Sequence, residues 1–171
     1  MQATGTLKLY ALDYKQLKTY AVAVAFIACN IIFPQLCHLA NMGGQTWLPI
    51  YFFTLIGAYK YGWRVGLLTA VASPLANCAI FGMPAAAMLP AILIKSGLLA
   101  IAAGVAASHL RRAPLAVFIA IVAFYQGVGG LGEWALTGSL DAAMQDFRLG
   151  LPGMLLQIVG GWIAINFIIR K

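Results

Sequence analysis

Two cysteines and a histidine are the residues of this chain best suited to metal chemistry. Cys78 stands at the end of a long apolar stretch, and Cys37 and His38 follow an earlier one. Thiolate is a soft ligand and imidazole a good one for transition metals, so Cys78 is a candidate metal ligand and His38 a weaker second. Two alternatives stay open: Cys78 is a small packing residue, or Cys37 and Cys78 form a disulfide. We do not expect a zinc site, because three or four clustered protein ligands are lacking.

Polar residues inside the apolar stretches are a second group of candidates. Such groups are costly in a bilayer and usually face the interior of a helix bundle. We expect Lys95, Glu133, Asn77 and Tyr125 to contact a ligand, with Lys95 meeting an anionic or amide group. A structural ion pair between Lys95 and Glu133 is the alternative, although about nine residues of helix place Lys95 about 13 Å below the outer end. For Asn77 and Tyr125 the alternative is a structural role, in which their side chains form hydrogen bonds between helices.

Further candidates lie near the same set of helix ends. Trp47 and Tyr51 begin an apolar stretch, and Met83 lies in a tight turn between two others. His38 and Asn41 lie in the connection that follows the first stretch. We expect these residues to line a binding pocket at the outer face.

The placement of basic residues predicts the elements that position these candidates. The chain has eleven Lys and Arg residues. All but Lys95 and Arg148 lie before the first apolar stretch, in every second gap between apolar stretches, or at the chain end. This positive-inside pattern predicts six membrane-spanning helices with both termini in the cytoplasm. We predict an all-α membrane protein with one domain over residues 1–171 and a cytoplasmic segment over 1–17. The expected helices span about 18–34, 47–59, 63–80, 85–108, 114–136 and 152–169.

Composition excludes several classes of protein. The chain is 63% hydrophobic and 9% charged, with a mean hydropathy of +0.90, so spans of about 20 residues leave no room for a soluble domain. The net charge of +7 is spread over helix ends, which argues against nucleic-acid binding. Continuous apolar runs argue against a β-barrel. The chain lacks a filter-like loop, which argues against an ion channel, and it is small for a transporter built from paired repeats. Ligand binding is the function that remains.

One long segment resembles a known family. The stretch from Trp47 to Thr69, followed by Met83-Pro84 and Leu89-Pro90, is similar to the S component of energy-coupling factor vitamin transporters. The shared features are a short helix ending in a Gly-x-Lys-Tyr-Gly-like turn, a Gly-rich helix and a Pro-containing turn. The resemblance covers about residues 18–170. It implies a six-helix protein of the bacterial cytoplasmic membrane that captures a vitamin at its outer face.

The resemblance also implies a partner. In that family, small residues on the first helix dock onto a membrane-embedded coupling subunit driven by two ATPases. Ala21, Ala25 and Cys29 are four residues apart and share one helix face, which suits close helix contact. The alternatives are that they pack within the chain, or that the protein works without a coupling module. The chain has no Gly-Lys-Ser/Thr phosphate loop, so we expect no ATP hydrolysis by it alone.

A branch of the family suggests a ligand. Solitary vitamin B12 proteins of the BtuM type hold the cobalt of the corrin through a cysteine, and Asn77-Cys78-Ala79 resembles that position. The resemblance implies cobalamin as transported ligand, with Cys78 on cobalt, His38 as a possible second ligand, and no intrinsic cofactor. The alternatives are another small vitamin, of the riboflavin, biotin or thiamine class, or a membrane assembly factor. Enzymatic activity is not expected beyond Cys-mediated modification of bound cobalamin.

Overall fold

The computed structural model describes residues 9–40, 44–110 and 113–169, and all regular structure within these ranges is helical. The all-α prediction is confirmed for this part of the chain. The elements in chain order are α1 (Leu17–Leu39), α2 (Gly44–Trp47), α3 (Pro49–Tyr61), α4 (Trp63–Phe81), η1 (Ala86–Met88), α5 (Leu89–Leu110), α6 (Leu115–Thr137), α7 (Leu140–Leu149), α8 (Leu151–Leu155), η2 (Leu156–Gly160), α9 (Gly161–Ile163) and η3 (Ala164–Ile168). The last four are contiguous, and η2 and η3 are π-helical turns.

Five helices of the described ranges are long and apolar enough to cross a membrane, which is consistent with a multi-pass membrane protein. They are Leu17–Leu39, Trp63–Phe81, Ala86–Leu110, Leu115–Thr137 and Leu151–Ile168. The remaining predicted span corresponds to α3, which has 13 residues. Its length of about 20 Å is less than the ~30 Å hydrocarbon core of a bilayer. The six-span count and the cytoplasmic termini therefore stay predictions.

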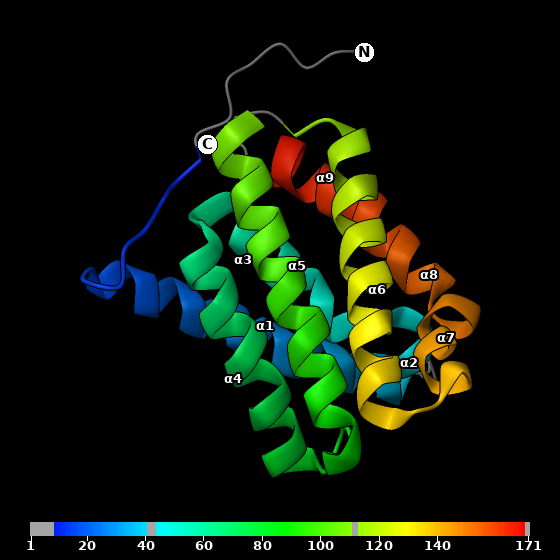
Figure 1. Cartoon of the computed structure of the whole chain (residues 1–171). Helices are drawn as coiled ribbons and strands as arrows, with labels where there is room; N and C mark the ends of the chain where they lie inside the picture. Colours follow the sequence, from blue (N-terminus) through cyan, green and yellow to red (C-terminus); the bar gives the residue numbers. More distant parts are fainter. Residues whose placement is uncertain (1–8, 41–43, 111–112, 170–171) are drawn as a thin grey trace.

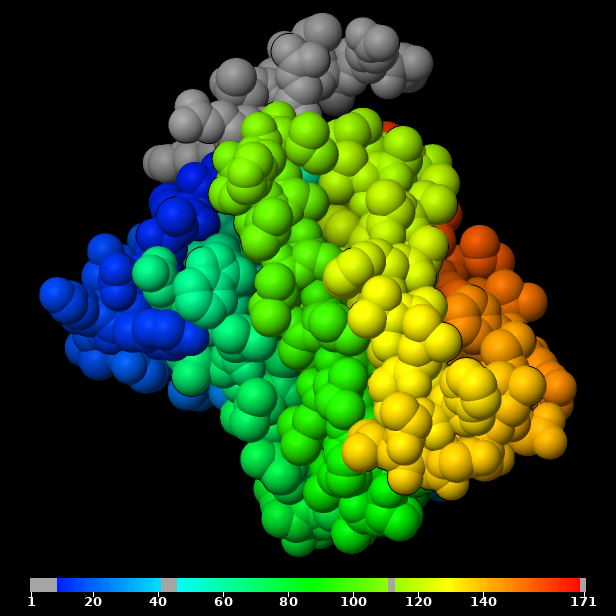
Figure 2. Space-filling model, in the orientation of Figure 1, coloured from blue at the N-terminus to red at the C-terminus, as the bar shows by residue number. Residues whose placement is uncertain are grey.

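The short helix α3 forms the centre of the bundle. Leu55, Ala58 and Tyr59 are fully buried, and α3 packs against α1, α4 and α5. Helices α4, α5 and α6 stand side by side, and α1 crosses behind them (Figure 1). In the space-filling view these three helices form one continuous face (Figure 2). Large apolar side chains remain exposed on this bundle, among them Val71, Ile101 and Leu131, as helices in contact with lipid require.

The described part of the N-terminal segment covers the turn between α3 and α4. The Tyr10 amide donates a hydrogen bond to the Lys60 carbonyl at 2.9 Å, and the Tyr10 and Tyr61 rings stack 5.6 Å apart. Gly62 makes the turn at a φ of +100°, where a side chain would be strained. Lys18 lies 5.1 Å from the centre of the Tyr10 ring. Three basic residues, Lys18, Lys60 and Arg64, are therefore gathered at this end of the bundle.

The expected end of the first helix at residue 34 was wrong. α1 continues past Pro34 to Leu39, so Cys37 and His38 lie in its last turns rather than in a loop. α4 likewise runs through Pro74 without interruption. Proline removes one backbone hydrogen bond, which a helix packed among others tolerates.

The expected loop between 137 and 151 contains the helix α7. The Ser139 side chain caps it by accepting a hydrogen bond from the Ala142 amide at 3.2 Å. Asp141 lies in its first turn and Arg148 in its last, where each charge complements the helix dipole. α7 was not predicted, because its polar residues indicated a loop although they follow the period of an amphipathic helix.

Candidate functional site

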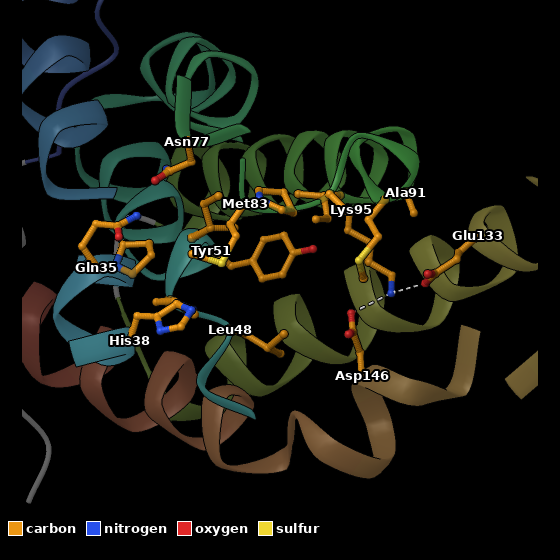
Figure 3. A pocket seen from close by; sticks show the side chains of 17 residues that line it. Gln35, His38, Leu48, Tyr51, Asn77, Met83, Ala91, Lys95, Glu133 and Asp146 are labelled. Atoms are coloured by element: carbon orange, nitrogen blue, oxygen red, sulfur yellow. Dashed lines mark hydrogen bonds and ion pairs between the residues drawn. The ribbon is translucent and has the colours of Figure 1, made fainter. Parts of the chain in front are cut away.

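A cavity of about 320 Å³ lies at the end of the bundle opposite Lys60. Its walls come from the end of α1, the start of α3, the end of α4, the α4–α5 connection, the start of α5, and one residue each of α6 and α7. The lining residues are Pro34, Gln35, His38, Leu48, Pro49, Ile50, Tyr51, Asn77, Met83, Pro84, Ala85, Met88, Ala91, Ile92, Lys95, Glu133 and Asp146. Their charged groups gather at one end, and Gln35, His38 and Asn77 lie toward the other (Figure 3).

The charged end is an ion triad formed by Lys95, Glu133 and Asp146, which we call the triad. The Lys95 Nζ donates to Glu133 Oε2 at 2.6 Å and to Asp146 Oδ2 at 2.7 Å. The lysine side chain is 2% exposed, while the two carboxylates keep 13% and 18% exposure. A buried ammonium is stable only with such partners. With all three groups ionised, the triad carries a net charge of −1.

Lys95 reaches the carboxylates because it is shallower than expected and because α6 leaves it room. α5 begins at Leu89, so Lys95 lies about 9 Å along the helix rather than about 13 Å. The lysine stem passes over Gly129 of α6, one helical turn before Glu133. A Cβ at position 129 would lie 2.5 Å from the Cγ of Lys95. The ion pair left open as an alternative is therefore present, and Lys95 also lines the cavity.

The opposite end of the cavity is organised by a polar network between α1, α3 and α4. The Asn77 Nδ2 donates to the carbonyls of Asn30 and Ser73, each at 3.0 Å. The Asn30 Nδ2 donates to Thr54 Oγ1 at 3.0 Å and to Ser73 Oγ at 3.3 Å. The Asn77 side chain is 1% exposed, and its Oδ1 accepts no hydrogen bond from any described residue. Asn77, which lines the cavity, thus has a buried acceptor without a donor among the described residues.

Tyr51 lies between the two ends of the cavity, and Tyr125 packs behind its ring. Its ring centre is 5.4 Å from that of Tyr125. The Tyr125 hydroxyl donates to Gln157 Oε1 at 2.7 Å and accepts from Gln126 Nε2 at 3.1 Å, which fixes the supporting ring. The Tyr51 hydroxyl points toward the triad (Figure 3). An aromatic ring with a polar tip therefore forms the middle of the cavity.

Six predicted binding residues line this cavity, and three do not. Those that line it are His38, Tyr51, Asn77, Met83, Lys95 and Glu133. Tyr125 is fully buried behind Tyr51, and Trp47 packs with its backbone against Gly153. Cys78 is absent from the lining because consecutive residues of α4 are turned by about 100°, and Asn77 faces the cavity. The predicted residue Asn41 lies outside the described residues.

The described residues offer no assembled metal site. All three cysteines, Cys29, Cys37 and Cys78, are free, so the disulfide left open as an alternative is not formed. Within the described ranges, no group of three or more His, Cys, Asp and Glu side chains lies close enough to hold a metal ion. Coordination of cobalt by Cys78 stays a prediction, separate from the cavity.

Asp146 is the main site residue that sequence reasoning missed. A signal was present, because the chain has only four acidic residues, and two of them, Asp141 and Asp146, are five apart. Five residues of helix turn by about 140° beyond a full turn, so the two must face different ways. Asp141 pairs with Arg148 at the surface, and Asp146 turns inward. Gln35 was missed because its segment was predicted to be a loop.

Two of the three small residues predicted to form a docking face on α1 are turned away from the rest of the chain. Ala21 and Ala25 are exposed, and Cys29 is half-buried. The alternative that Ala21 and Ala25 pack against another helix of this chain is therefore wrong. Docking of a partner on this face stays a prediction.

Comparison with protein-family models, with curated proteins and with solved structures finds no match to this chain. The fold and the site define its class: an all-helical bundle, consistent with a multi-pass membrane protein, that carries a ligand-sized cavity at one end.

Proposed function

We propose that this protein is a membrane-embedded binding protein that captures a small organic molecule for uptake, as the S component of a vitamin transporter does. The observation that carries the proposal is the cavity itself. It combines an apolar wall with a few convergent polar groups, which is the usual composition of small-molecule sites. Glu133, Asp146 and Asn77 contribute polar groups with acceptor oxygens that a ligand would satisfy.

The distribution of charge supports an outward-facing site. Lys18, Lys60 and Arg64 gather at the end opposite the cavity, and basic residues mark the cytoplasmic side of membrane proteins. We therefore place the cavity at the outer face and the basic end in the cytoplasm. The exposed face of Ala21 and Ala25 on α1 would then meet a coupling subunit within the membrane.

The size of the cavity favours a small vitamin over a corrinoid. A volume of about 320 Å³ is at the lower limit for drug-sized ligands, which occupy about 300–1,000 Å³. A corrinoid is a macrocycle with amide side chains and a nucleotide loop, and it is much larger than such ligands. Cys78, its proposed cobalt ligand, does not line the cavity. We therefore propose a smaller molecule, of the size of a riboflavin, biotin or thiamine class vitamin, as ligand.

The test is native mass spectrometry of the detergent-purified protein, followed by identification of any released molecule. The wild type is expected to carry a small molecule, and Ala91→Trp, which fills the cavity, is expected to lose it. Ile101→Trp adds the same ring on the outer face of the same helix, where Ile101 is 46% exposed, and should retain the molecule. Equal occupancy in Ala91→Trp and Ile101→Trp, or no bound molecule in the wild type, would contradict the proposal.

A further inference from the structure

We propose that the cavity selects a ligand with a positively charged nitrogen group, such as an ammonium, amidinium or heteroaromatic cation, and with a hydrogen-bond donor at its other end. This inference rests on the proposed binding function and specifies the chemical class of the ligand. Two independent features carry it: the net charge of the triad at one end, and the unpaired acceptor of Asn77 at the other.

The triad is one positive charge short. Lys95 supplies one ammonium to two carboxylates, and the other lining residues include no further Lys or Arg. The nearby Arg148 does not compensate, because its guanidinium pairs with Asp141 at 3.1 Å on the exposed side of α7. An excess negative charge in a largely apolar cavity is costly unless a cation neutralises it.

Each carboxylate of the triad lines the cavity and keeps one oxygen that the lysine does not use. The lysine takes Oε2 of Glu133 and Oδ2 of Asp146, and both side chains keep partial exposure. Figure 3 shows the two carboxylates on either side of the lysine Nζ at this end of the cavity. A planar cation with several N–H groups would donate to both carboxylates at once.

Tyr51 adds to the preference for a cation. Its ring lines the cavity beside the triad, and ring faces attract cations. An anionic ligand would instead meet the two carboxylates of the triad. The same wall that attracts a cation therefore rejects an anion.

Asn77 defines the second requirement. Both of its observed hydrogen bonds use Nδ2 as donor to backbone carbonyls, and this fixes the orientation of the amide. The Oδ1 is left buried without a donor among the described residues, which is costly unless a ligand supplies one. The residue lines the cavity at the end away from the triad. A ligand that donates an N–H or O–H here would satisfy it.

The test uses three probes of the same shape and different charge: benzamidine, benzamide and benzoate. Their dissociation constants are measured by calorimetry on ligand-depleted protein in detergent at pH 7. We expect benzamidine to bind at least about tenfold more tightly than benzamide, and benzoate to bind most weakly. Equal affinities, a preference for benzoate, or no binding of benzamidine would overturn the inference.

Two variants on α7 make the test specific. Asp146→Asn keeps the shape and the Lys95–Glu133 pair but makes the triad neutral, so the preference for benzamidine over benzamide should fall about tenfold. Asp141→Asn/Arg148→Gln removes the exposed ion pair of α7, whose carboxylate is 85% exposed and outside the cavity, and it should leave the preference unchanged. The same loss in both variants, or in neither, would contradict a role for the triad.

Identification of the co-purified molecule separates the two proposals. A cation that is lost in Ala91→Trp supports both. A neutral or anionic molecule lost in that variant would overturn the charge inference and leave the binding function standing. Absence of any molecule from the wild type would remove the binding function itself.

Discussion

The stem of Lys95 occupies the space that a side chain at position 129 would need. A Cβ on Gly129 would lie 2.5 Å from the Lys95 Cγ and 3.4 Å from its Cα, so α5 and α6 approach closely at this point. The glycine thereby allows a lysine on one helix to reach a glutamate one turn further along the other. The first prediction follows from this relationship.

Gly129→Ala should displace Lys95 and weaken both the triad and ligand binding. We expect a loss of about 1–3 kcal/mol in the free energy of unfolding, typical of an overpacked core. Gly127→Ala is the matched control, because a Cβ there meets nothing within 4 Å. Unfolding is followed in mixed micelles with increasing SDS. Equal behaviour of the two variants would show that the close approach is not maintained.

Lys95→Met should be more damaging than the loss of an exposed lysine. It leaves Glu133 and Asp146 facing each other without a cation, and breaking a buried pair costs about 3–5 kcal/mol. Lys15→Met, at an exposed position, should change stability by less than about 0.5 kcal/mol. The double variant Lys95→Met/Glu133→Gln should recover part of the loss. No recovery would mean that charge repulsion is not the cause.

The polar network predicts different effects for its two asparagines. Asn30→Ala removes two donated hydrogen bonds between α1 and the helices α3 and α4, and should cost about 1 kcal/mol of stability. The Asn30 carbonyl still holds Asn77, so ligand affinity should be retained. Asn77→Ala removes the cavity acceptor and should lower affinity. Calorimetry with the co-purified ligand distinguishes the two, and a loss of affinity in Asn30→Ala alone would contradict the assignment.

Cys78→Ala should leave ligand binding unchanged, because Cys78 does not line the cavity. The corrinoid hypothesis predicts the opposite. Visible absorption spectra after incubation with cobalamin and desalting decide between them. A shifted corrin spectrum in the wild type that is lost in Cys78→Ala would restore cobalamin as the ligand and cobalt coordination by Cys78.

The proposed orientation predicts which end reacts with external reagents. In a background without native cysteines, Ser139→Cys lies at the cavity end of the bundle and Ser108→Cys at the basic end, and both positions are exposed. A membrane-impermeant maleimide applied to intact cells should label Ser139→Cys only. Labelling of Ser108→Cys alone would reverse the orientation and refute an outward-facing cavity.

The helices of this protein were largely predictable because their signal is local. The predicted helices at 63–80 and 114–136 each differ by about one residue from α4 and α6. Apolar runs of this length fold as helices in a bilayer, because each backbone polar group there needs an internal hydrogen-bond partner. The boundaries at Pro34 and at the start of α5 were less predictable, because proline and short turns take their conformation from the neighbouring helices.

The binding site was predictable only in part. Lys95, Glu133 and Asn77 were identified because ionisable and amide groups are costly in apolar helices and usually have a specific role. Their assignment to two ends of one cavity depends on helices that are far apart in sequence, and composition carries no information about which faces meet. Cys78 was a plausible binding residue by its type. It directly follows Asn77 on α4, so its side chain is turned away from the cavity.

Hydropathy and helical length are local properties, so a bundle of apolar helices with a few buried polar groups follows directly from the order of residues along the chain. That Asp146 joins Lys95 and Glu133 depends on tertiary structure, because the packing of α7 against α6 defines which face of α7 points inward. That third residue changes the triad from a neutral pair to a net negative site. The chemistry of the cavity is therefore set by packing between helices rather than by any motif along the chain.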